Sequence, residues 1–202
     1  MGAIRALLLF WLVVCAGQST FAADQVVTLV FTAPGASSKL ALQEMQRETA
    51  AVMQSAGVHV RWVPLLEAQL GGEFVEPVQV RLQGRCDMSG FEHPVRTTDR
   101  SLGWTHVSDG KVLRFIDLDC SRLRLSLFSA MWGEDFQHRD FLLGRALGRV
   151  LAHELHHAIG RETEHPANGL ACAQVRVENL IRGTARLYGN SPRRDDAAGG
   201  GL

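Results

Sequence analysis

A long amphipathic segment in the second half of the chain places the strongest constraint on its fold. From Phe136 to Ile159, apolar residues recur three and four positions apart, which is the spacing of one helix face. Asp135 can cap the start of this helix, and Gly160 can end it. The sequence therefore predicts a helix of about six turns with one face directed into a hydrophobic core.

Three ionisable side chains lie on the core-facing stripe of this predicted helix. At about 100° per residue, His153, Glu154 and His157 fall within about 80° of the apolar stripe. Polar groups on such a stripe are unfavourable unless they are paired or bound to a metal ion. Arg149 and His156 fall on the opposite side, at about 120° or more. We therefore expect His156 to face solvent or to form an outer wall, and not to bind metal.

The spacing of the histidines suits a metal ion. His153 and His157 are four residues apart, so their imidazoles lie one turn apart and can reach the same ion. Glu154 lies about 60° from His157, close enough to lean over the ion without binding it. Past Gly160, His165 is the candidate third ligand, because a turn there can bring its imidazole back. Three protein ligands plus water form the open pattern of catalytic zinc, whereas structural zinc prefers four closed ligands.

Five residues together resemble the active-site motif of the zincin metallopeptidases: His153, Glu154, His157, Gly160 and His165. The predicted order of elements is most similar to the metzincin branch of that family. The resemblance implies an α+β fold, in which a mixed β-sheet with a backing helix precedes a long active-site helix and a C-terminal helix. It also implies a Zn2+ ion held by the three histidines, with Glu154 as the catalytic residue.

Two features differ from the metzincin pattern. A metzincin places its third histidine six residues after the second, where this chain has Thr163, so His165 comes two residues later. The methionine turn of that branch has no counterpart, because the last methionine is Met131. The two helical histidines and the glutamate beside them match the motif without change.

The third ligand has a second candidate. Zincins of the other large branch use a glutamate about twenty residues downstream on the following helix, and Glu178 lies 21 residues after His157 on a helix predicted for residues 174–188. We prefer His165, because Gly160 ends the helix where a nearby ligand requires it. Glu178 is then expected to orient an imidazole from outside the set of ligands.

The resemblance implies a zinc-dependent peptidase, an endopeptidase in preference to an exopeptidase, that acts on peptide or protein substrates. Glu154 would serve as general base toward the attacking water. An extended substrate would pair with an edge strand, for which residues 78–82 and 112–117 are the two candidates. The alternative is a non-catalytic secreted binding or envelope protein on the same scaffold, and a third possibility is a structural zinc site.

The segments before the long helix predict the remainder of an α+β domain. Two valine-rich strands flank a helix, which indicates a crossover unit, and three more strands follow, two of them as a hairpin around Asp109 and Gly110. The expected strands cover residues 25–32, 58–63, 77–82, 102–107 and 112–118, and the expected helix covers residues 39–55 after Ser37 or Ser38 as its cap.

Length and charge limit the classes of function. The chain has 202 residues, which corresponds to one domain, here predicted over residues 23–188. Lys plus Arg number 21 and Asp plus Glu number 21, so no field of one sign favours nucleic acid as a partner. Residues 189–202 are small and polar, and we expect them to be disordered. The oligomeric state has no signal in the sequence.

The N-terminus and the cysteines indicate export. Residues 1–22 have the layout of a secretory signal peptide, with one early cation and an apolar run of eleven residues at 6–16. That run is about half the length of a membrane-spanning helix, so we expect no stable membrane insertion after cleavage. Cys86 and Cys120 bracket a polar stretch and are expected to form a disulfide, although three buried thiols are the alternative, and Cys172 is left over. A secreted or periplasmic location follows.

Overall fold

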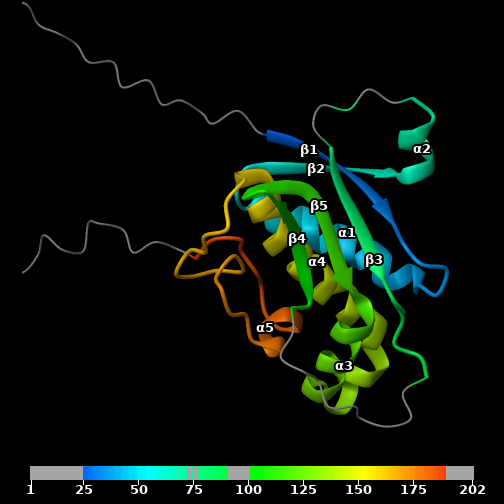
Figure 1. Ribbon diagram of the computed structural model, residues 1–202. Coiled ribbons are helices and arrows are strands. Elements are labelled where there is room, and N and C mark those ends of the chain that lie inside the picture. The colour runs from blue at the N-terminus through cyan, green and yellow to red at the C-terminus, as the bar shows by residue number, and fades with distance from the viewer. Residues whose placement is uncertain (1–24, 72–73, 75–76, 91–100, 190–202) are drawn as a thin grey trace, which may run out of the picture.

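The computed structural model describes residues 25–71, 74, 77–90 and 101–189 (Figure 1). The predicted signal peptide, residues 1–22, lies outside the described residues, as does the predicted tail after its first residue, Gly189. Among the helices of the described part of the chain, none combines the length and the apolar character that crossing a membrane requires.

A five-stranded mixed sheet forms one layer of the fold, in the order β2-β1-β3-β5-β4. Its strands are β1 (Gln25–Thr32), β2 (Val58–Pro64), β3 (Val78–Gln83), β4 (Gly103–Ser108) and β5 (Lys111–Asp119). The first four strands in this order run parallel, and β4 runs antiparallel to β5 at one edge. Asp109 and Gly110 turn the predicted hairpin with φ of 50° and 73°. The predicted α+β class is confirmed.

Helix α1 (Lys39–Gln54) connects the parallel strands β1 and β2, which confirms the predicted crossover unit. The side chain of Ser38 caps it by accepting a hydrogen bond from the N–H of Ala41 at 3.4 Å. Figure 1 shows α1 behind the sheet, on the same face as the long helix α4 (Arg139–Gly160). The hydrophobic core therefore lies between the sheet and these two helices.

The predicted long helix is present, but it begins at Arg139 and not at Phe136. Residues Gly133–His138 form a 3-10 helix, η1, that precedes it. Asp135 does act as a cap, but for this shorter element: its carboxylate accepts the N–H of Trp132 at 3.1 Å. Asp135 is thus the third residue of η1 and completes a capping box there, so the prediction that it caps the start of the long helix is wrong.

Two glycines let α4 approach α1 closely. A Cβ atom at Gly148 would lie 2.8 Å from the carbonyl oxygen of Met45, and one at Gly144 would be still nearer to that of Ala41. The hydroxyl of Thr49 donates to the Met45 oxygen at 2.7 Å and lies 3.3 Å from the oxygen of Gly148, so it fills the narrow contact. Close packing at these positions leaves no room for a side chain.

Arg149 shows that the side of α4 opposite its apolar stripe is also covered by protein. Its side chain is only 2% exposed. The guanidinium donates to a carboxylate oxygen of Glu48 at 2.7 Å and to the carbonyl oxygens of Asn179, Arg182 and Gly183 at 2.6–2.7 Å. The chain after α4 folds over this side, so α4 is surrounded by protein, and the buried charge of Arg149 is paired, with four of its five N–H groups in hydrogen bonds.

The helix predicted for residues 174–188 is wrong. Only α5 (Val177–Ile181) is helical, and the backbone becomes extended at Arg182, with a ψ of 157°. The carbonyl groups that would continue the helix bind Arg149 instead. Residues 186–189 then pair with residues 168–171 through backbone hydrogen bonds. Hydrogen bonds to the side chain of Arg149 thus replace the helical hydrogen bonds that the carbonyl groups of Arg182 and Gly183 would otherwise accept.

Two helices appear that the sequence pattern did not predict, α2 (Leu65–Gln69) and α3 (Cys120–Ala130). Cys120, the first residue of α3, forms the predicted disulfide with Cys86, at a Cα–Cα distance of 5.0 Å. The bridge fastens the chain after β3 to the start of α3. Cys172 is the free thiol among the described residues.

Edge strand β4 is held on both of its faces. On the helix side, Gly103 lies so near to Val150 of α4 that a Cβ atom would meet it at 3.0 Å. On the other side, the buried carboxylate of Asp117 accepts hydrogen bonds from His106 of β4 at 2.8 Å and from Arg81 at 2.6 Å. Burial raises the pKa of Asp117, but these hydrogen bonds outweigh it and hold the pKa below its usual value.

Replacing Gly148 with alanine is expected to destabilise the protein by roughly 1–3 kcal/mol, the usual range for overpacking. Alanine is the better helix former by about 1 kcal/mol, so a loss of stability would report the contact with α1. Urea denaturation of the variant and the wild type measures the difference. Ala51→Gly, on the exposed side of α1, is the control, because it measures the difference in helix propensity between alanine and glycine without a packing contact. An unchanged or higher free energy of unfolding for Gly148→Ala would contradict the close contact.

Candidate metal centre

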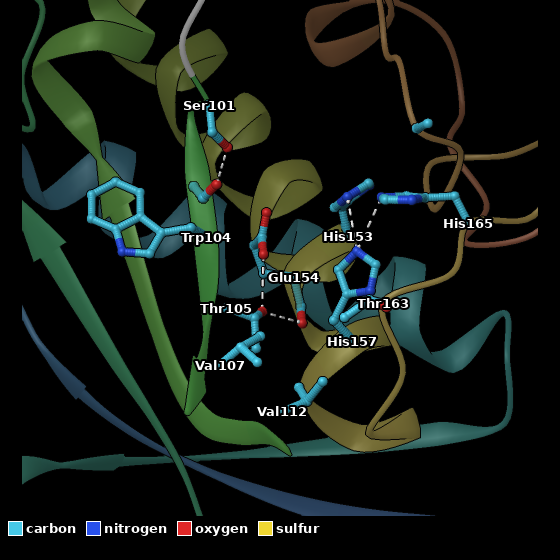
Figure 2. Close-up of a pocket in the computed structure, with 12 residues that line it drawn as sticks. Ser101, Trp104, Thr105, Val107, Val112, His153, Glu154, His157, Thr163 and His165 are labelled. Atoms are coloured by element: carbon cyan, nitrogen blue, oxygen red, sulfur yellow. Dashed lines mark hydrogen bonds between the residues drawn. The ribbon is translucent and has the colours of Figure 1, made fainter. Parts of the chain in front are cut away.

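Three imidazoles meet beside the end of α4, and we call them the histidine cluster: His153, His157 and His165 (Figure 2). His153 and His157 extend from successive turns of α4, and His165 comes from the loop that follows. The Nε2 atom of His157 lies 3.3 Å from that of His153 and 3.2 Å from that of His165. All three ligand atoms lie within 4.8 Å of one another, so the cluster could hold a metal ion.

The outer nitrogens of two imidazoles are already engaged. Nδ1 of His153 lies 2.8 Å from the carbonyl oxygen of Leu170, and Nδ1 of His157 lies 2.9 Å from that of Glu162. A carbonyl oxygen can only accept, so both Nδ1 atoms carry the proton and both Nε2 lone pairs face the cluster. Metal-binding histidines are commonly oriented in this way.

The separations also fit a metal ion in size. Nitrogens bound to one tetrahedral ion at 2.0–2.1 Å lie about 3.3 Å apart. The two shortest separations in the histidine cluster, 3.2 and 3.3 Å, agree with this value. Lone pairs facing one another at such distances repel, and a cation between them removes that repulsion.

The loop that carries His165 begins one residue later than the sequence indicated. Gly160 is the last residue of α4, and Arg161 takes the left-handed conformation, with φ of 55°. The chain reverses there and returns along the end of the helix. His165 thereby reaches the other two imidazoles although it is exposed and has no helical support.

Burial controls the charge of the groups around the cluster. Desolvation lowers the pKa of His153 and of His157, which keeps their imidazoles neutral and able to bind a cation. Desolvation raises the pKa of Glu154, although the nearby Thr105 and His157 oppose this. The carboxyl of Glu154 therefore exchanges a proton more readily near neutral pH than an exposed glutamate.

Glu154 lines the same cavity as the histidine cluster, and it is held by β4. Its carboxylate lies 2.9 Å from the hydroxyl of Thr105, and the same hydroxyl lies 2.9 Å from the backbone oxygen of Glu154 (Figure 2). The hydroxyl has one proton, which these two oxygens of Glu154 share, so a single hydrogen-bond donor on β4 holds this residue. Because Glu154 is only 6% exposed, its position depends on these contacts.

Two cavities open at this site. The smaller, of about 320 Å³, is lined by the three histidines, Glu154 and residues of β4. The larger, of about 820 Å³, shares His153 and Glu154 with it and continues between β4, α3 and residues 170–180. The histidine cluster and Glu154 therefore stand in an open cleft, and a molecule longer than a single residue has room beside them.

Glu178 is not brought to the cluster. It lies exposed on α5, and the group that binds Nδ1 of His153 is the carbonyl oxygen of Leu170. The expected role of Glu178 in orienting an imidazole is therefore wrong. His156 forms an outer wall, the second of the two expected possibilities: it is buried, and its Nε2 lies 3.2 Å from the carbonyl oxygen of Glu164.

The role of β4 as the free edge beside the site was not predicted from the sequence. Residues 78–82 and 112–117 belong to β3 and β5, which both have neighbours on either side, so neither can be the free edge. The free edge next to the site is β4, and it supplies Thr105. Alternating sequence patterns give the faces of strands but not their order, and they contain no signal that separates Thr105 from other threonines.

Comparison with known proteins identifies no relative: no model of a known family matches the chain, and no curated protein is significantly similar to it. The positions and donor atoms of the three histidines define what the histidine cluster can bind.

Substitution of any one histidine of the cluster by alanine is expected to weaken the binding of a divalent metal ion, with Zn2+ as the probe, by more than about 100-fold, since loss of a group that only orients a ligand already weakens metal binding 10–100-fold. Equilibrium dialysis with metal analysis measures the affinity. His138→Ala, an exposed histidine before α4, is the matched control and should bind as the wild type does. Chelation should leave the far-UV circular dichroism intact; global unfolding would indicate a structural site instead.

Proposed function

We propose that the protein is a secreted zinc-dependent endopeptidase that hydrolyses peptide or protein substrates at the histidine cluster, with Glu154 as general base. The observation that carries the proposal is the convergence of three Nε2 atoms in an open cleft that also contains the buried carboxyl of Glu154. The resemblance of His153, Glu154, His157, Gly160 and His165 to the zincin motif supports the same reaction.

Zinc is the metal that this donor set favours. Three imidazoles are typical ligands of catalytic zinc, and carboxylate-rich sites suit magnesium or calcium better. Within the described residues, the group of ligand atoms contains the three histidines and no cysteine or carboxylate. The site therefore has an open coordination position, which supports catalysis over a structural role.

Bound zinc would supply the Lewis acid that lowers the pKa of water and polarises the scissile carbonyl. Glu154 accepts the proton of the attacking water and returns it to the leaving amine. The raised pKa of Glu154 suits both steps, because the carboxyl must hold a proton between them. Thr105 holds the carboxyl by a hydrogen bond, and the burial of Glu154, which is 6% exposed, limits its contact with bulk water.

The free edge of β4 supports an extended peptide as substrate. An edge strand offers unpaired backbone N–H and C=O groups, and a peptide can pair with them as an additional strand. The two cavities meet at His153 and Glu154, so a chain laid along β4 could continue past the histidine cluster. Room beyond the site of cleavage favours an endopeptidase over an exopeptidase.

The disulfide between Cys86 and Cys120 indicates an oxidising compartment. Together with the signal-like sequence of residues 1–22, it supports secretion or a periplasmic location. A peptidase in such a compartment would meet extracellular or envelope proteins as substrates.

Glu154→Gln is expected to lower kcat/KM for a mixed peptide library by more than about 1000-fold, because the amide cannot accept a proton, at the strong end of what acid–base catalysis contributes. Zinc stoichiometry should stay at that of the wild type. Mass spectrometry of the digested library gives the activity. Glu164→Gln, an exposed glutamate near the site, is the control. A wild-type protein that binds zinc but cleaves nothing would favour the non-catalytic binding protein.

Thr105→Val should lower kcat roughly 10- to 100-fold, the effect of losing one hydrogen bond to a charged group, while zinc affinity stays unchanged. Valine keeps the branched shape of threonine but cannot hydrogen-bond with Glu154. Thr105→Ser keeps the hydroxyl and is expected to retain most of the activity. Steady-state kinetics of the three proteins make the comparison, and equal kcat values would exclude a role for this hydroxyl.

A further inference from the structure

The loop that presents the third histidine has little support of its own. Residues 161–165 are all exposed, so no buried side chain anchors them. Two neighbouring histidines of α4 hold the loop by its backbone instead: His157 binds the carbonyl oxygen of Glu162 at 2.9 Å, and His156 binds that of Glu164 at 3.2 Å. These two hydrogen bonds fix the backbone at Glu162 and Glu164, directly before the third imidazole.

The tautomer of His156 decides whether its hydrogen bond to the loop can form. The carbonyl oxygen of Glu164 accepts only, so Nε2 of His156 must carry the proton. In the neutral imidazole, Nδ1 is then an acceptor, and it lies 3.1 Å from the hydroxyl of Tyr188. The hydroxyl of Tyr188 then donates to Nδ1 and fixes the rotation of the imidazole, so that the Nε2 proton points at the carbonyl oxygen of Glu164. The carboxylate of Glu162, 3.6 Å from Nε2, favours the same tautomer.

We propose that Tyr188 is a positioning residue for the metal centre: its hydroxyl, acting through His156, fixes the backbone beside His165 and so keeps the third imidazole on the ion. This inference rests on the proposed metal-binding function of the histidine cluster. A side chain of the C-terminal segment thus controls a ligand that lies 23 residues earlier in the chain.

The C-terminal segment is built to hold Tyr188 in place. Residues 186–189 pair with residues 168–171 through three backbone hydrogen bonds of 3.0–3.2 Å. Leu187 is 1% exposed and anchors the segment in the core. Gly169 has a φ of 93°, and a Cβ atom there would lie 2.5 Å from the oxygen of Leu187, so only glycine permits this pairing. Tyr188 is therefore presented by a fixed backbone.

The same pairing also supports a second imidazole. The N–H of Leu170 donates to the carbonyl oxygen of Arg186 at 3.0 Å, while the oxygen of Leu170 accepts from Nδ1 of His153 at 2.8 Å. One segment thus braces His153 through its backbone and His165 through the side chain of Tyr188. The side-chain route can be removed by itself, because it depends on a single hydroxyl.

Loss of this hydroxyl would act on the site more than on the fold. The side chain of Tyr188 is 46% exposed, and its ring packs edge-on against His156 at 5.6 Å, a contact that phenylalanine retains. Without the donor, one of the two hydrogen bonds that orient the imidazole of His156 is lost. The Nε2 proton is then held less firmly against the oxygen of Glu164, and the hydrogen bond to the loop weakens.

The test compares zinc affinities of the full chain, measured by competition with a chromophoric chelator. Tyr188→Phe is expected to bind zinc about tenfold more weakly, which is the low end of the loss seen when a group that orients a metal ligand is removed. The thermal midpoint of the metal-free variant should equal that of the wild type. His156→Leu should be weakened at least as much. His156→Gln can still donate to the loop and accept from Tyr188, so it should bind more tightly than His156→Leu.

The double variant Tyr188→Phe with His156→Leu decides whether the two residues act in series. If Tyr188 acts through His156, the double variant binds zinc as weakly as His156→Leu alone. Additive losses, or a wild-type affinity for Tyr188→Phe, would overturn the inference and leave the metal centre standing. A wild-type protein that binds no zinc would overturn the proposed function and this inference together.

Discussion

The burial of α4 on every side is the constraint on which the rest of the structure depends. Gly144 and Gly148 of α4 let α1 pack closely against it, and Gly103 lets β4 do the same. On another side, Arg149 donates to carbonyl groups of residues 179–183. A helix enclosed in this way cannot rotate without breaking contacts on several faces. Its last two turns therefore carry His153 and His157 in fixed positions, and the site is preorganised before any ion binds.

Local periodicity predicted the elements that depend on local contacts. Patterns of neighbouring residues were enough to predict the strands β1, β3 and β5 and the helix α1. They also predicted the hairpin turn at Asp109 and Gly110. The predicted helix at residues 174–188 failed because its carbonyl groups serve Arg149, a residue some thirty positions earlier. The order of the strands, and hence the free edge at β4, likewise depends on pairing that no local pattern contains.

The candidate site divides in the same way. His153, Glu154 and His157 could be predicted because helix geometry alone brings them together, and His165 because the chain must turn after Gly160. The groups that orient them could not, because the carbonyl oxygens of Leu170 and Glu162 are backbone atoms that any residue would supply. Thr105 and Tyr188 are recognisable only after the strand and the C-terminal segment have been placed.

The fold holds the two helical histidines of the cluster more firmly than the histidine of the loop. His153 and His157 belong to the most enclosed helix, whereas His165 belongs to an exposed loop held by two imidazole hydrogen bonds. Regions with few buried contacts open at a lower free energy than the core. The affinity for an ion bound to all three imidazoles would therefore depend mainly on how firmly the loop holds His165. The hydrogen bonds that hold this loop would set that affinity. Evolution of such a site could tune metal binding through the C-terminal segment without disturbing the core of the helix.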